Sequence, residues 1–387
     1  MAINKEQNKL NVPPLRFPEF HGEWEEHGLS EYLDFKNGLN PDSKRFGKGI
    51  KFISVMDILN NPVITYDCIR ASVQATDAEM SSFSVEYGDI LFQRSSETLE
   101  DVGRANVYID DKVAVFGGFV IRGKKKANYN PLFFRYLLSS PYARKRIIPM
   151  GAGAQHFNIG QEGLSKVLLN FPSIEEQTKI ASLLHLLDER IATQSKLIEK
   201  LESLIKGISS RIFASIQGFE YRMGDIVTIT NGNSNVQDAV TQSKDGLYPF
   251  FDRSEDIKYL PTFLFDKEAI IYPGEGTEFM PRYFKGKFAL HQRCYAIFDF
   301  NEIINARFLY FYLKTRNSYF VQNAVGSTVP SLRLDTFQKL KVIIPPKKIQ
   351  HSVSLCLSSM EQKCNVEKKI LHKLLKQKQY LLRQMFI

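Results

Sequence analysis

Pro172–Phe213, PSIEEQTKIASLLHLLDERIATQSKLIEKLESLIKGISSRIF, decides the fold, because Pro345–Phe386, PPKKIQHSVSLCLSSMEQKCNVEKKILHKLLKQKQYLLRQMF, repeats it without a gap. The gapless match reaches back to Gly153 and Gly326, at a constant offset of 173 residues. Identical residues include the pairs Gly153/Gly326, Pro172/Pro345, Gln177/Gln350, Leu184/Leu357, Lys200/Lys373, Leu201/Leu374 and Phe213/Phe386. Such self-similarity indicates that one structural unit occurs twice in the chain.

Both repeats carry apolar residues at alternating steps of four and three, which is the spacing of a heptad seam. The seam of the first repeat is Ile180, Leu184, Leu187, Ile191, Gln194, Ile198, Leu201, Ile205, Ile208 and Ile212. The seam of the second repeat is Val353, Leu357, Met360, Cys364, Glu367, Leu371, Leu374, Lys378, Leu381 and Met385. More than four heptads predict one long helix in each repeat, with a seam on the order of 50 Å at 1.5 Å per residue.

The two long helices are expected to pack on each other, since each is the natural partner of the other. If a pseudo-twofold axis relates the halves, the helices are antiparallel and the two globular regions lie at opposite ends of a rod. Gln194 and Glu367 occupy the same seam position in the two repeats. A polar residue in a seam can fix the register of the helices at some cost in stability. A local hydrated defect is the other interpretation.

With small gaps, the repeat extends upstream into both globular regions. FFRYLL at Phe133–Leu138 matches FLYFYL at Phe308–Leu313, and Asn37-Gly38 resembles Asn231-Gly232. Short β-branched and aromatic runs between turns predict strands. One helix is expected in each half ahead of the last strand, near 131–145 and again near 306–321.

The predicted fold class is therefore α+β, with two pseudo-twofold-related mixed α/β domains joined by two long antiparallel coiled-coil helices. The predicted boundaries are an N-terminal arm at 1–20, a first domain at 21–172, a first spacer helix at 173–216, a second domain at 217–345 and a second spacer helix at 346–387.

Composition excludes several classes of protein. Of 387 residues, 51 are Lys or Arg and 42 are Asp or Glu, which leaves a net charge of +9, and 43% are apolar, a globular value. No apolar run reaches the roughly 18–20 residues of a membrane helix, and Met1–Leu10 has no apolar signal segment. The four cysteines include no C-x-x-C pair. We expect a cytoplasmic protein without a membrane or metal site.

The sequence offers no catalytic site. The P-loop, G-x-G-x-x-G and H-E-x-x-H patterns are absent. Asn130-Pro131-Leu132-Phe133 is similar to the Asn-Pro-Pro-Tyr/Phe motif of amino-methyltransferases but lacks the second proline, and a helix start with proline in the first turn is the simpler interpretation. Glu199, Lys200 and Glu202 flank the heptad seam and are typical of solvated helix charges. No catalytic residue is predicted.

What remains is typical of nucleic-acid recognition, because basic, amide and aromatic residues are interleaved in predicted loops. Arg, Gln and Asn read base edges, whereas Lys and Ser mainly hold phosphates. The DNA-binding candidates are Lys44, Arg45, Lys48, Arg94, Ser95, Arg104, Gln155, His156, Asn158, Arg282, Lys285, His291, Gln292, Arg293, Ser327 and Thr328. For each of these residues taken alone, the alternative interpretation is an ordinary exposed polar side chain that does not contact DNA.

Over nearly its whole length the chain resembles the specificity subunit of a type I restriction-modification system. Pro14–Phe20 followed by Trp24 is similar to the usual entry of that family, and Gly88–Phe92 with Arg94 to its target-domain strand. Pro172, then Glu176-Gln177 and Ile180, is similar to the start of its first spacer helix. No single motif decides the resemblance, but their order together with the repeat is specific.

The resemblance implies two target recognition domains, each reading one half of a bipartite asymmetric site in double-stranded DNA. It also implies that the antiparallel coiled coil sets the gap between the half-sites and docks two methylation subunits. Those subunits hold S-adenosylmethionine, while restriction subunits, where present, use ATP and Mg²⁺ to translocate and cleave. The chain itself then needs no cofactor and is not an enzyme.

One departure from the family pattern lies at the start of the second long helix. Ile349-Gln350 replaces the acidic residue and glutamine of the first, and Lys347 and Lys348 precede it. Because lysines oppose the dipole at a helix N-terminus, we expect this start to be frayed or bound to a partner. This expectation puts fully symmetric docking of the two methylation subunits in doubt.

Two other function classes remain as alternatives. A stand-alone nuclease or methyltransferase would modify DNA without partners, and a coiled-coil scaffold for proteins would not bind DNA in a sequence-dependent way. Residues 346–387 carry nine Lys or Arg and two Asp or Glu, whereas both predicted domains are close to neutral. We therefore expect the isolated chain to bind DNA weakly.

Overall fold

The computed structural model describes residues 11–387 and divides into two compact units. The first unit runs to Ser195 and takes in Ile370–Ile387, and the second unit is Lys196–Lys369. The first ten residues of the predicted N-terminal arm lie outside the described part. Each long helix therefore contributes to both units.

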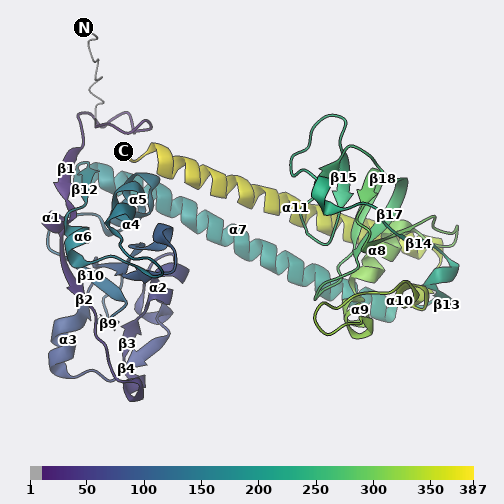
Figure 1. The fold of residues 1–387 in the computed structure, drawn as a ribbon, viewed down its shortest axis with the longest axis horizontal. Coiled ribbons are helices and arrows are strands. Elements are labelled where there is room, and N and C mark those ends of the chain that lie inside the picture. The colour runs from purple at the N-terminus through teal and green to yellow at the C-terminus, as the bar shows by residue number, and fades with distance from the viewer. Residues whose placement is uncertain (1–10) are drawn as a thin grey trace, which may run out of the picture. The chain divides into compact units, whose positions relative to one another are not determined.

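The first unit combines small sheets with short helices (Figure 1). Its strands are β1 (Glu25–Gly28), β2 (Leu33–Asn37), β3 (Phe46–Ile53), β4 (Ala71–Val73), β5 (Ser84–Val85), β6 (Ile90–Gln93), β7 (Ser95–Ser96), β8 (Ala105–Val107), β9 (Ala114–Phe116), β10 (Val120–Lys125), β11 (Phe157–Asn158) and β12 (Leu168–Phe171). Its short helices are α1 (Leu29–Tyr32), α2 (Val55–Asn60), α3 (Asp77–Phe83), α4 (Pro131–Ser139), α5 (Pro141–Ile147) and α6 (Gln161–Ser165). The strands form sheets in the orders β2-β10-β6-β8, β4-β3-β9-β5, β1-β12 and β11-β7.

The second unit gathers most of its strands into one sheet. Its strands are β13 (Phe219–Arg222), β14 (Thr228–Asn231), β15 (Tyr248–Phe251), β16 (Lys258–Leu260), β17 (Phe265–Pro273), β18 (Arg282–Leu290), β19 (Cys294–Phe298) and β20 (Lys341–Ile344). Its short helices are α8 (Ala306–Lys314), α9 (Asn317–Asn323) and α10 (Leu334–Gln338). The sheets have the orders β14-β19-β17-β18-β15-β16 and β13-β20.

The two units share one strand order, which is the structural form of the sequence repeat. The order β2-β10-β6-β8 of the first unit corresponds to β14-β19-β17-β18 of the second. The two-stranded sheets β1-β12 and β13-β20 also agree in register. Glu25 pairs with Phe171 and Phe219 pairs with Ile344, and Phe171 and Ile344 are equivalent in the repeat. The second sheet of the first unit, β4-β3-β9-β5, likewise corresponds to β16-β15-β18-β17, and β3 runs parallel to β9 as β15 runs parallel to β18. In the second unit the two sheets are continuous because β17 and β18 are long enough to belong to both.

Two long helices, α7 (Ile174–Ser215) and α11 (Lys347–Gln384), lie side by side in each unit (Figure 1). In the first unit Asp188 near the start of α7 pairs with Lys378 near the end of α11. In the second unit Glu202 near the end of α7 pairs with Lys368, and the helices are therefore antiparallel, as predicted. The seam residues named from the sequence are buried or half-buried along both helices, while most of the residues between them are exposed. The predicted α+β fold is confirmed.

Both long helices begin on a buried glutamine that ties three segments together. The side-chain amide of Gln177 donates to the carbonyl of Pro172 (3.0 Å), and its oxygen accepts from the backbone N–H of Asn130 (3.1 Å). Gln350 repeats these bonds with Pro345 (2.8 Å) and Asn305 (2.7 Å). Of the two alternatives for the start of the second long helix, fraying is wrong, because buried hydrogen bonds outweigh the weak repulsion between exposed lysines and the helix dipole. Binding of a partner at this start stays a prediction.

In the first unit, the acidic residue next to this glutamine binds an arginine of the N-terminal segment. Glu176 is buried and forms a two-pronged ion pair with Arg16, at 2.8 and 2.7 Å. Ser173 caps the N–H of Glu176 (3.4 Å), while the carboxylate of Glu176 turns to the arginine and does not return to the helix start. Its equivalent, Ile349, is exposed, which accounts for the departure seen in the sequence.

The helix predicted near 131–145 is two helices, because the chain turns between α4 and α5 at Ser140-Pro141. Proline lacks the N–H that a continuing helix would use, and it begins α5 instead. The helix predicted near 306–321 is likewise divided into α8 and α9. Both α4 and α8 start on an asparagine whose side chain caps the first turn, Asn130 and Asn305.

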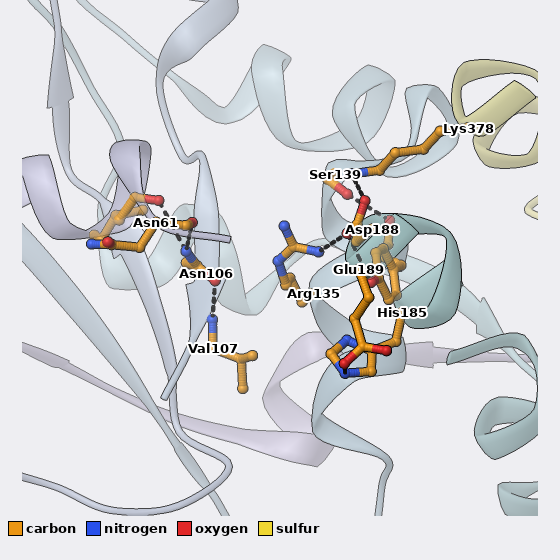
Figure 2. Close-up of polar contacts among 11 residues, drawn as sticks. Asn61, Asn106, Val107, Arg135, Ser139, His185, Asp188, Glu189 and Lys378 are labelled. Carbon is orange, nitrogen blue, oxygen red and sulfur yellow. Dashed lines mark hydrogen bonds and ion pairs between the residues drawn. The ribbon is translucent and has the colours of Figure 1, made fainter. Parts of the chain in front are cut away.

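Equivalent carboxylates join the long helices to the short ones. Asp188 of α7 accepts from Arg135 (3.3 Å) and Tyr136 (2.9 Å) of α4 and pairs with Lys378 of α11 (2.5 Å). Figure 2 shows Arg135 and Lys378 converging on Asp188. In the second unit Glu361 of α11 takes the same place and accepts from Tyr310 of α8 (2.7 Å).

Replacing Gln350 with leucine is expected to destabilise the second unit by about 1–3 kcal/mol. The change keeps the side-chain size but leaves the N–H of Asn305 and the carbonyl of Pro345 without partners in a buried place. Urea unfolding, monitored by a spectroscopic signal from the second unit, checks this prediction, and the unfolding midpoint is expected to fall. The matched control is Gln362→Leu on the exposed face of α11, which should leave the midpoint within about 0.5 kcal/mol.

Candidate nucleic-acid interface

Four segments meet at one end of the main sheet of the first unit. They are the loop 38–46 after β2, the turn 117–119 before β10, the segment 94–96 after β6 and the hairpin 152–158. The N–H of Leu39 donates to the carbonyl of Phe116 (2.9 Å), and the N–H of Arg94 donates to that of Phe119 (2.9 Å). The N–H of Ile159 then donates to the carbonyl of Arg94 (2.9 Å). We call these four segments the loop edge of the first unit.

The second unit has the same loop edge, made of 232–236, 291–293, 274–276 and 325–331. The N–H of Ser234 donates to the carbonyl of Leu290 (3.1 Å), and the N–H of Leu332 donates to that of Gly274 (2.8 Å). The bridge Val325–Ser331 repeats the bridge Ala152–Asn158 at the offset of the sequence repeat. Equivalent backbone therefore carries different side chains in the two units.

The structure brings several predicted DNA-binding residues together in the first unit. Arg94 lies between the turn and the hairpin, and its guanidinium donates to the carbonyl of Gly118 (3.3 Å). The hydroxyl of Ser95 donates to Asn158, because β7 pairs with β11. Gln155 and His156 are exposed at the tip of this hairpin.

The other basic candidates of the first unit are placed less favourably for reading bases. Arg45 is engaged by Glu79 and by the carbonyl of Gln74 (2.6 Å). Its ion pair lowers the pKa of Glu79 to about 2. Arg104 pairs with Asp101 at 2.6 Å, whereas Lys44 and Lys48 are exposed. Of these four, Lys44 and Lys48 are therefore the candidates for phosphate contacts.

In the second unit the predicted cluster separates into two parts. His291, Gln292 and Arg293 form the turn of the loop edge, and Ser327 and Thr328 are exposed on its hairpin. Arg282 is turned inward, where its guanidinium holds the carbonyls of Asp252 and Ser254. Lys285 is exposed on β18, outside the four segments.

Each loop edge borders a cavity that is open to solvent, and the two cavities differ in chemistry. The cavity of the first unit has a volume of about 390 Å³ and is lined by Phe46, Phe52, Met56, Gly118 and Phe119 among others. That of the second unit measures about 520 Å³ and is lined largely by charged and polar groups, among them Asp252, Arg253, Glu275, His291, Gln292 and Arg293. The same position in the fold is apolar in one unit and polar in the other.

Burial and ion pairing shift the pKa values of several groups in the polar cavity. Burial alone would raise the pKa of Asp252, but the ion pair with Lys258 (2.6 Å) and bonds from Ser254 hold it below its ordinary value. Burial lowers the pKa of His291, which favours the neutral ring, and its Nδ1 accepts from the backbone N–H of Arg293 (3.2 Å). Burial raises the pKa of Cys294 to about 11, which keeps this thiol protonated.

Sequence reasoning missed the apolar and acidic members of the loop edges. Phe119 is 70% exposed, which is unusual for a phenylalanine, and Phe46 and Met56 are also exposed. Glu275 is an acidic residue, and the sequence pattern typical of DNA contacts consists of cations and amides. Aligning the two halves strand by strand would have found Phe119 opposite Arg293, since each directly precedes an equivalent strand, β10 or β19.

A family described as "Type I restriction modification DNA specificity domain" matches residues 21–203 and again 218–376. The chain belongs to this family. The two matches cover both units, which agrees with the internal repeat, and the family predicted from the sequence is confirmed.

The related sequences are specificity subunits of several organisms. The type I restriction enzyme EcoDI specificity subunit of Escherichia coli is 30% identical over 123 residues, 32% of this chain and 26% of that protein. A putative MjaX specificity subunit of Methanocaldococcus jannaschii is 24% identical over 218 residues, 55% of this chain and 50% of that protein. The matched regions thus span a quarter to a half of the length of these relatives.

Solved structures share the fold at low identity. The S subunit of a type I restriction-modification system from M. genitalium has a TM-score of 0.68 at 18% identity, covering 97% of this chain and 99% of that one. A structure from work on complex assembly and conformational transition of a type I system has a TM-score of 0.54 at 13% identity, over 93% and 96% of the two chains. These likenesses support the fold.

Two kinds of feature are absent from the described residues. Within 11–387, the structure contains no helix with the length and apolar character needed to cross a membrane. Over the same residues, no group of three or more His, Cys, Asp or Glu side chains is arranged to hold a metal ion.

Proposed function

We propose that this chain is the DNA-reading subunit of a type I restriction-modification complex and that each unit reads one half of a bipartite, asymmetric site. The observation that carries the proposal is the pair of loop edges. Their backbones are equivalent, so they can meet DNA in the same way, and their side chains differ, so they select different sequences.

The charges of the loop edges fit this role. Side chains on phosphates position a protein, whereas Arg, Asn and Gln on base edges specify sequence. In the first unit Lys44 and Lys48 are free to hold phosphates, and Arg94 and Asn158 lie where they can reach bases. In the second unit Gln292 and Arg293, on the turn of the loop edge, lie where they can reach bases. With both domains nearly neutral, strong binding requires partners to complete the contact with DNA.

The helices α7 and α11 act in this proposal as a ruler between the half-sites. A helix has a fixed rise of about 1.5 Å per residue, and the same face of DNA recurs about every 34 Å. An antiparallel pair with a buried seam keeps the number of base pairs between the half-sites constant.

The outer faces of these helices are proposed to dock two methylation subunits. Leu183, Leu186 and Leu204 of α7 and Leu355 of α11 are exposed although their helices bury a separate apolar seam. Exposed apolar side chains repeated on one element indicate a protein-binding surface. In this proposal S-adenosylmethionine belongs to the methylation subunits, and ATP with Mg²⁺ to restriction subunits. We further propose that the complex is cytoplasmic, where its DNA is.

Mapping methylated adenines in the source genome, with and without this chain, tests the function. We expect one bipartite motif to lose methylation when the chain is deleted and to regain it from a plasmid copy. A motif that survives deletion would contradict the proposal. Modification of DNA by the purified chain alone would favour the enzyme alternative, and sequence-independent binding of the complete complex would favour the scaffold.

Arg94→Ala is expected to weaken recognition of one half-site only, by about 1–3 kcal/mol if the guanidinium reads a base. The reason is its place between the turn and the hairpin of the first loop edge. Competition binding of the complete complex with target DNA altered in one half at a time measures this. The control Lys124→Ala removes an exposed cation from the opposite end of β10 and should change nothing. An equal loss on every DNA sequence would identify Arg94 as a phosphate contact.

A further inference from the structure

One position of the loop edge carries opposite chemistry in the two units. Phe119 and Arg293 each end the turn before an equivalent strand, and each is exposed: 70% for Phe119 and 62% for the side chain of Arg293. The carbonyl of Phe119 accepts from the N–H of Arg94 at 2.9 Å, so the backbone is anchored while the side chain is free to contact a ligand.

In the second unit this position belongs to an ion pair that matches a G·C base pair. Arg293 donates through one terminal nitrogen to Glu275 at 2.6 Å. Its other N–H groups have no protein acceptor within residues 11–387 and lie beside the cavity. An arginine reads O6 and N7 of guanine, and a glutamate accepts from N4 of cytosine. Because Glu275 is mostly buried, it also holds the arginine in one orientation.

In the first unit the equivalent pair is Phe119 and Ser95. An exposed phenylalanine beside a cavity lined by Phe46, Phe52 and Met56 offers no hydrogen bond to guanine. The apolar group that DNA presents in the major groove is the 5-methyl group of thymine. Phenylalanine contacts this group, and Ser95 imposes no charge on the opposite base.

The backbone explains why each unit has one arginine on its loop edge but at a different position. Arg94 has Gly274 as its equivalent, and a Cβ at Gly274 would lie 2.0 Å from the carbonyl oxygen of Arg293. The second unit therefore carries its arginine on the turn, and the first carries it on the neighbouring segment.

From this we infer that position 119 in the first unit and position 293 in the second are equivalent specificity-determining positions, Phe119 selecting a thymine methyl group and Arg293 with Glu275 selecting a G·C pair. The inference rests on the proposed function and adds the class of base that each unit reads.

The decisive experiment transplants the pair. The complete complex, carrying Phe119→Arg and Ser95→Glu in this chain, is expressed in a host free of other adenine methylation, and its methylated motif is sequenced. We expect one T·A pair of the first half-site to become G·C while the second half-site stays unchanged. The matched controls are Tyr87→Arg, an exposed aromatic at the other end of β6, and Lys267→Ala, which breaks an exposed ion pair with Asp299 at the other end of β19. Both should retain the wild-type motif.

Base analogues test the same inference with the unaltered complex, so a variant that fails to fold does not decide the outcome. Uracil in place of the critical thymine should weaken binding about fourfold, because the free energy of burying one methyl group is lost. In the other half-site, 7-deazaguanine should weaken it roughly tenfold. If the bipartite motif depends on the chain but neither transplant nor analogues change it, the reader positions are wrong and the proposed function stands. If no motif depends on the chain, the proposed function itself fails.

Discussion

Removing one heptad from each long helix is expected to abolish methylation of the natural target and to shorten the preferred gap between half-sites by about three base pairs. Seven residues correspond to about 10.5 Å of helix, and DNA rises about 3.4 Å per base pair. The half-sequences themselves should stay the same, because the loop edges are untouched. This is the strongest consequence of the ruler proposal.

The deletion is designed to keep both helices intact. Removing Arg190–Lys196 and Ile370–Lys376 takes whole heptads, so the remaining seam residues return to the same helix face. The anchoring contacts remain, since Asp188 and Lys378 lie outside the deleted segments. A gap shorter by three base pairs also turns one half-site by roughly a quarter to a third of a helical turn. Part of the loss on the natural target therefore comes from reading the wrong face of DNA.

Motif sequencing of DNA methylated by the complete complex measures the new gap. The control replaces the same heptads with unrelated heptads of equal length and equal seam, and it should preserve the natural gap. A deletion in only one helix should instead lower stability, because it puts the seams out of register. An unchanged gap after deletion in both helices would refute the ruler.

The sequence predicted the long helices and the repeat because their signals are local and periodic. A heptad seam needs only the spacing of apolar residues, and a gapless offset needs only the alignment. The buried seam residues Leu184 and Leu357 follow directly from this pattern. The strands were predicted separately, from short β-branched and aromatic runs between turns.

The roles of individual polar residues were harder to predict because they depend on partners far away in sequence. Arg45 was an attractive DNA contact until the fold brought Glu79 beside it, and Arg282 until it was found holding backbone carbonyls. Phe119 was overlooked because an apolar residue is ordinarily taken to be buried. Only its position opposite Arg293 gives its exposure a meaning.

A second large effect is expected from Gly232→Ala, which should abolish reading of the half-site of the second unit. Gly232 follows β14, where the loop edge approaches the turn 291–293 backbone to backbone. A Cβ at this position would lie 2.0 Å from the carbonyl oxygen of Leu290 and 2.5 Å from that of His291. Because backbone atoms make the clash, no change of rotamer relieves it, and the turn has to move.

The same close approach occurs at Gly38, whose Cβ would lie 2.1 Å from the carbonyl oxygen of Gly117. The Asn-Gly pairs noted in the sequence, at 37–38 and 231–232, thus mark a shared steric requirement. Moving the turn strains the packing and breaks backbone bonds such as that from Ser234 to Leu290. Together these cost about 3 kcal/mol or more, which is over a hundredfold in affinity.

Binding of the complete complex to DNA with either half-site altered distinguishes local from global damage. For Gly232→Ala we expect the complex to become indifferent to the half-site of the second unit while still discriminating in the other half. Gly38→Ala should have the opposite effect. The control Gly207→Ala adds a methyl group in open space within α7 and should stabilise the chain by about 0.5–1 kcal/mol. Retained discrimination in both halves would show that the loop edges do not read DNA, since their geometry cannot accommodate the added carbon without changing.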